Sequence, residues 1–67
     1  MIVFKWINRY SGECGYIKVI STKERHFINT TNLEEAKKYS KNSVERMTKL
    51  LAEYGELDNN DLEVVSC

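Results

Sequence analysis

The chain has 67 residues, of which 42% are hydrophobic and 30% charged, and its ten Lys and Arg residues balance its ten Asp and Glu residues. These values are typical of one small globular domain, residues 1–67, and they exclude a disordered chain or a polycation built around nucleic acid. No stretch reaches the roughly 20 apolar residues that a membrane span requires. Because the start of the chain also lacks the pattern of a secretion signal, we expect a cytoplasmic protein.

In the first part of the chain the side chains alternate between two faces with a period of two, and many of them are β-branched or aromatic. This pattern predicts β-strands. Over residues 2–9 the alternation places two sets of side chains on opposite faces: Ile2, Phe4 and Trp6 on one, and Val3, Lys5, Ile7 and Arg9 on the other. A turn at residues 11–12 and a second strand at 16–20 complete a hairpin, because Gly12 tolerates positive φ. A two-residue turn there predicts that Trp6 faces Ile17 and that Phe4 faces Val19. Residues 27–28 are expected to form a short third strand.

The middle of the chain carries helix start signals. The patterns Thr31-x-x-Glu34 and Asn32-x-x-Glu35 both have the spacing of a capping box and predict a helix start near Leu33. The pattern Asn42-x-x-Glu45 offers a second start. From there apolar residues recur at three- and four-residue steps and form one stripe, namely Val44, Met47, Leu51 and Tyr54.

The end of the chain closes the fold. Gly55 is placed to terminate the helix as a C′ residue, and residues 62–65 predict a last strand. The expected fold is therefore α+β: a small antiparallel sheet of three to four strands, with one main amphipathic helix packed on one face, in the order ββ(β)αβ.

The helical stripe is expected to cover the more apolar sheet face. The predicted core then consists of the sheet residues Ile2, Phe4, Trp6, Ile17 and Val19. One helix cannot cover both faces of a sheet, so the opposite face is open in a monomer. That face is expected to carry Val3, Lys5, Ile7, Arg9, Cys14, Tyr16, Lys18 and Ile20. A register slip of one residue exchanges the two faces.

The open face suits a protein partner that is apolar in places and negative in others, or a second copy of the chain. The candidate binding residues are Lys5, Ile7, Arg9, Tyr16 and Lys18. The same basic and aromatic residues also fit a single-stranded nucleic acid, which is the alternative function. A third interpretation is an ordinary solvated sheet face, on which Lys and Arg stems lie over aliphatic side chains.

Charge is segregated along the chain. All ten basic residues and five of the acids fall in residues 1–52, whereas residues 53–67 carry the other five acids and no base. Such a dipole orients encounters with charged partners. The acidic end is therefore a second candidate surface, or only a solvated edge.

The sequence shows no spacing of nucleophile, base and acid residues that is typical of a catalytic site. His26 is the only histidine, and neither a Ser-His-Asp nor a Cys-His arrangement is apparent. Cys14 and Cys67 do not form a C-x-x-C pair, and they are expected to be free thiols, with a disulfide as the alternative. We expect no enzyme activity, no cofactor and no metal site.

The run NLEEAKKYSKNS at residues 32–43 follows a strand pair and precedes an amphipathic helix and a last strand. The chain is also rich in Lys, Asn, Ile and Glu and has no Pro. In this pattern the chain resembles the small ββαβ accessory proteins encoded by phages and prophages of low-GC Gram-positive bacteria. The resemblance covers the whole chain. It implies a protein that binds or inhibits a host or phage protein, and it carries over no catalytic or ligand residues.

Overall fold

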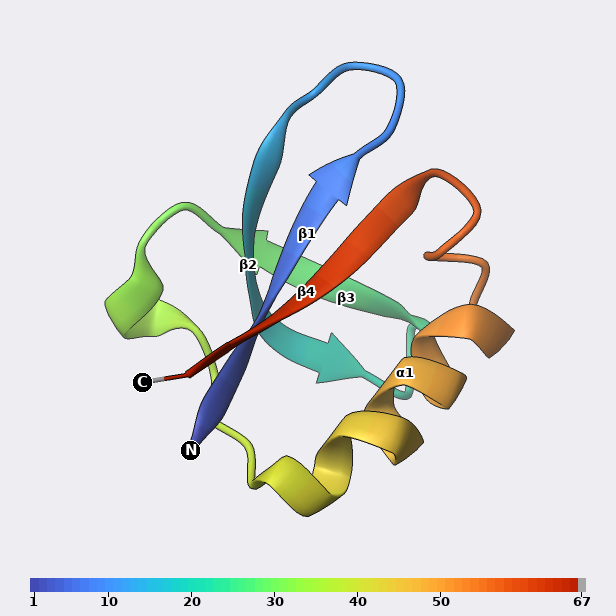
Figure 1. Cartoon of the computed structure of the whole chain (residues 1–67). Coiled ribbons are helices and arrows are strands. Elements are labelled where there is room, and N and C mark those ends of the chain that lie inside the picture. Colours follow the sequence, from blue (N-terminus) through green and yellow to red (C-terminus); the bar gives the residue numbers. More distant parts are fainter. Residues whose placement is uncertain (67) are drawn as a thin grey trace.

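The computed structural model describes residues 1–66 and confirms the α+β class and the ββ(β)αβ order. Four antiparallel strands form one sheet in the order β3-β2-β1-β4, and one α-helix lies against it (Figure 1). The elements are β1 (Ile2–Asn8), β2 (Cys14–Ser21), β3 (His26–Thr30), the 3₁₀ turns η1 (Leu33–Glu35) and η2 (Lys41–Ser43), α1 (Val44–Glu53) and β4 (Asn60–Ser66). Within residues 1–66, no helix is both long enough and apolar enough to cross a membrane.

The hairpin register differs from the predicted one. Trp6 pairs with Gly15 rather than Ile17, and the predicted pair of Phe4 and Val19 does not form. The reason is the loop length, because the Asn8 N–H donates to the Glu13 carbonyl at 2.8 Å and closes a loop of four residues instead of two. The shift is by two residues. Since side chains alternate with the same period, each residue of β1 keeps its predicted face.

β1 is a central strand with unequal neighbours. It pairs with β4 along its whole length but with β2 only at Lys5, Trp6 and Ile7. Beyond these residues β1 and β2 diverge, as Figure 1 shows. The backbone groups of Ile2 that β2 leaves free are bonded by Tyr39, with N–H···O distances of 2.8 Å in both directions.

The segment after η1 is therefore extended rather than helical, which corrects the predicted helix start near Leu33. The Asn32 side chain does cap a turn there, by accepting from the Glu34 N–H, but only η1 forms and the chain is already extended at Ala36. The Lys37 N–H then donates to the Lys18 carbonyl at 3.1 Å. Because the backbone of residues 37–39 bonds to two strands, it is not available for helical hydrogen bonds.

The core lies between the sheet and α1. Four residues are almost completely buried in one cluster, namely Ile2, Phe4, Ile17 and Leu51. Trp6, Val44 and Met47 pack against this cluster as predicted. Five further partly buried residues also pack against this cluster, and none of them belongs to the predicted core. They are Ile20, Phe27, Tyr39, Leu57 and Leu62.

Two predicted positions in β2 exchange faces. Val19 was expected in the core and Ile20 on the open face, but Ile20 packs against the core and Val19 does not. The cause is a β-bulge, because the pairing to β3 shifts between Ile17 and Val19 and leaves Lys18 without a partner strand residue. One extra residue in a strand reverses the alternation beyond it.

The C-terminus of α1 follows the prediction. Gly55 has a φ of 79°, and its N–H donates to the Ala52 carbonyl while the Glu56 N–H donates to the Leu51 carbonyl. These two bonds define a Schellman motif, which requires a left-handed residue at C′. The last residue of the predicted stripe, Tyr54, is not part of the core but lies beneath the Arg25 guanidinium, 5.0 Å from its ring centroid.

Candidate functional site

The sheet face opposite α1, here called the outer face, brings residues of all four strands into rows. The first row runs from β3 to β4 through directly paired residues: Thr30, Tyr16, Lys5 and Glu63. The second row consists of Cys14, Ile7 and Asp61. Residues that are directly opposite in a sheet have neighbouring side chains on one face. Three of the five candidate binding residues, Lys5, Ile7 and Tyr16, are thus side by side.

One end of the outer face is closed, which corrects the placement of Val3 on an open surface. Val3 has no exposed area, although it lies outside the core cluster beneath α1. Ala36 is also buried outside that cluster, and the segment that carries it is bonded to Ile2 and Lys18. The outer face is therefore closed to solvent at Val3.

Arg9, the candidate at the end of β1, is hydrogen-bonded within the chain. Its Nε donates to the Asp61 carboxylate at 2.9 Å, and its two terminal nitrogens donate to three backbone carbonyls, those of Leu57, Asp58 and Asn60. The guanidinium therefore holds the loop between α1 and β4 against the end of β1.

The remaining candidates differ in exposure. Lys5, Ile7 and Tyr16 are half-buried, whereas Lys18 is exposed at the bulge of β2. None of the ion pairs among residues 1–66 includes Lys5 or Lys18. The outer face thus retains two cations without an acidic partner, beside a tyrosine and an isoleucine.

The acidic end of the chain does not form one separate surface. Asp61 and Glu63 lie in β4 and join the rows of the outer face. Glu53 ends α1, while Glu56 and Asp58 lie in the loop that follows. Two negative side chains therefore border the predicted basic surface, and Asp61 is the only one of them that forms an ion pair within residues 1–66.

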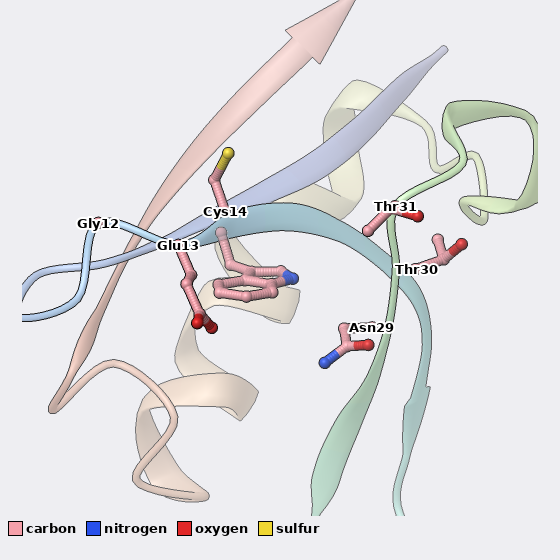
Figure 2. Close-up of a pocket in the computed structure, with 7 residues that line it drawn as sticks. Gly12, Glu13, Cys14, Asn29, Thr30 and Thr31 are labelled. Carbon is pink, nitrogen blue, oxygen red and sulfur yellow. The ribbon is translucent and has the colours of Figure 1, made fainter.

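A second candidate site lies on the α1 side of the sheet, at the hairpin end. It is an open hollow of about 530 Å³, lined by Trp6, Gly12, Glu13, Cys14, Asn29, Thr30 and Thr31. In Figure 2 the Glu13 carboxylate and the Asn29 amide lie on the same side of the strands, and the Cys14 sulfur points the other way. No spacing in the sequence indicates this hollow, because its lining residues come from β1, β2 and the loops and strand that flank them.

The groups considered for catalysis or metal binding are not assembled in the described part of the chain. His26 lies 2.9 Å from the Glu24 carboxylate, and its other ring nitrogen contacts the Phe27 carbonyl. Cys14 is an exposed free thiol, whereas Cys67 lies outside the described residues. No group of three or more His, Cys, Asp or Glu residues within residues 1–66 is arranged to hold a metal ion.

No family model, no curated protein and no solved structure matches this chain.

Proposed function

We propose that the chain is a non-enzymatic protein-interaction module that binds a protein partner through its outer face. The observation that carries the proposal is the row of paired residues in which Tyr16 and Lys5 are neighbours, beside Ile7. The only α-helix of the described residues packs on the other side of the sheet. An exposed surface that mixes aromatic, aliphatic and charged groups has the composition of a protein interface.

The chemistry of the outer face defines its partner. Tyr16 and Ile7 offer apolar contact area at the centre, while Lys5 and Lys18 are cations without an ion pair among the described residues. A complementary surface is apolar at its centre and carries carboxylates at its rim. For a phage-type accessory protein, this partner is a host or phage protein that the module inhibits or modulates.

Nucleic acid is the weaker alternative for the same face. Arg9 is bonded to Asp61 and three carbonyls, so its charge is already paired with a carboxylate of the chain. Glu63 lies directly beside Lys5 in the first row and repels a phosphate chain. Binding of a fluorescent single-stranded oligonucleotide that weakens steeply with added salt and is lost in Lys5→Glu would favour this alternative.

The proposal is tested by affinity capture with matched baits. One bait carries Lys5→Glu with Tyr16→Ala, and the control carries Lys41→Glu with Tyr10→Ala, which changes the charge equally at exposed positions outside the outer face. Proteins retained by the parent and control baits but not by the outer-face bait are then purified. Titration calorimetry of each purified protein with the three baits should then rank their affinities in the same order: parent and control high, outer-face bait low.

A self-association version of the proposal has its own measurement. Sedimentation equilibrium of the parent chain should show a dimer that Lys5→Glu with Tyr16→Ala dissociates. If the parent is a monomer at high concentration and all three baits retain the same proteins, the outer face is not a protein-binding surface.

A further inference from the structure

We propose that the hollow above Trp6 binds a cationic side chain of a polypeptide, arginine by preference. This hollow is on the α1 side of the sheet, and the outer face is on the opposite side. The inference therefore goes beyond the proposed function. A negative binding result at one of the two sites leaves the other site untouched.

The floor of the hollow is an aromatic ring held in place by a glycine. Gly15 lies opposite Trp6 in the ladder, and a Cβ at Gly15 would fall 3.1 Å from two atoms of the indole. The indole thus lies over the backbone of β2, with the Phe27 ring 6.1 Å from its centroid on the β3 side. Because Trp6 is only partly buried, the ring also lines the open hollow.

The walls of the hollow are negative or neutral. Glu13 is exposed, and it takes part in no ion pair within residues 1–66. The lining includes no Lys or Arg, so no internal cation neutralises Glu13 there. The volume of about 530 Å³ is within the range of about 300–1,000 Å³ seen for ligand pockets.

The aromatic contacts elsewhere in the chain support the choice of a cation. The guanidinium of Arg25 lies 5.0 Å from the Tyr54 ring centroid, and the ammonium of Lys37 lies 5.5 Å from that of Tyr39. An indole attracts cations more strongly than a phenol ring does. Nevertheless, among residues 1–66, Trp6 has no cation over its ring.

Arginine fits this combination of groups better than other cations. Its planar guanidinium stacks on an aromatic face while its N–H groups donate in the plane to a carboxylate. In the hollow the Trp6 indole supplies the face and the Glu13 carboxylate accepts the charge-assisted bonds, with the Asn29 amide among the other lining groups. A phosphate-bearing ligand meets Glu13 and is repelled.

The test uses the single tryptophan of the chain as its reporter. The probe is the peptide acetyl-Gly-Arg-Gly-amide, and the matched control peptide carries citrulline, which has nearly the same shape without the charge. Titrations in the millimolar range follow the Trp6 indole N–H and backbone signals by NMR. The variant is Glu13→Gln, and its matched control is Glu53→Gln, an exposed carboxylate on α1 without an ion pair.

We expect the arginine peptide to shift the signals of Trp6, Glu13 and Asn29 and the citrulline peptide to bind at least about tenfold more weakly, the factor that 1.4 kcal/mol represents. Glu13→Gln should weaken arginine binding to a similar extent, while Glu53→Gln and the outer-face variant Lys5→Glu leave it unchanged. Equal binding of the two peptides, equal binding by Glu13→Gln, or binding of uridine monophosphate in place of the arginine peptide would overturn the proposal.

Discussion

Gly15 is the residue directly opposite Trp6, and the indole occupies the space where a side chain at Gly15 would lie. A Cβ built at this position also falls 3.1 Å from the Thr30 carbonyl oxygen, which belongs to the neighbouring strand. The backbone of β3 cannot move away as readily as a flexible side chain. The absence of a side chain at this one position therefore determines where the only tryptophan lies.

The first prediction concerns this contact. Gly15→Ala should lower the free energy of unfolding by about 1–3 kcal/mol, because an added methyl group overpacks a site bounded by backbone. It should also shift the Trp6 emission maximum, since the ring must move. Urea unfolding followed by fluorescence measures both effects. A variant with the parent stability and emission would show that the indole does not rest on Gly15.

The second prediction tests the closed end of the outer face. Val3 is fully buried, while Val64 is 49% exposed in the adjacent strand. Val3→Thr should cost about 1–3 kcal/mol of stability, because the change buries a hydroxyl group without a partner. Val64→Thr introduces the same group in contact with water and should be nearly neutral. Thermal melts of both variants suffice, and equal melting temperatures would contradict the burial of Val3.

The elements that could be predicted from the sequence are those with local signals. The alternation of Ile2, Phe4 and Trp6 and the stripe from Val44 to Leu51 are each repeated several times, so one ambiguous residue does not obscure the pattern. The end of α1 was also predictable, because only a residue such as Gly55 adopts positive φ without strain.

The features that were missed depend on contacts between distant residues. The bulge at Lys18 has no signal of its own in the sequence, yet it exchanges the faces of Val19 and Ile20. Likewise, the capping pattern at Asn32 correctly indicates a local turn, but the strand-like bonds of Tyr39 to Ile2 prevent a helix from continuing. At Tyr39, tertiary hydrogen bonding outweighed the local helix propensity.

The candidate site was predictable only in part, for the same reason. Period-two alternation is enough to place Lys5, Ile7 and Tyr16 on one face. The bonds of Arg9 to carbonyls at residues 57–60 join the two ends of the chain, and no sequence spacing indicates them. The Trp6 hollow likewise requires the β1–β2 register and the pairing of β3 to be known first.

The third prediction separates the two kinds of bond that Arg9 makes. If the carbonyl bonds dominate, Arg9→Lys should lower the free energy of unfolding by about 1–2 kcal/mol, because lysine lacks the fork that reaches several acceptors. Asp61→Asn should cost less than about 1 kcal/mol, since exposed ion pairs contribute little. Urea unfolding of the two variants gives the comparison. A larger loss for Asp61→Asn than for Arg9→Lys would assign the role to the ion pair instead.

The fourth prediction follows from the burial of Tyr39, whose ring packs 5.4 Å from that of Phe4. Burial disfavours the phenolate and raises the pKa of Tyr39 above its usual value of 10.0. The native state therefore binds this proton more tightly than the unfolded chain does. It follows that the contribution of Tyr39 to stability is fully present below the unfolded pKa and is lost as the pH rises through the folded pKa.

Tyr39→Phe removes this titration while keeping the ring. Its free energy of unfolding should therefore fall less steeply than that of the parent between about pH 9 and about pH 11, the range around a tyrosine pKa. Tyr10→Phe, at a side chain that is 79% exposed, is the matched control and should follow the parent. Urea unfolding at several pH values in this range measures the slopes. Parallel curves for the parent and Tyr39→Phe would mean that the Tyr39 hydroxyl is as well solvated in the native state as in the unfolded chain.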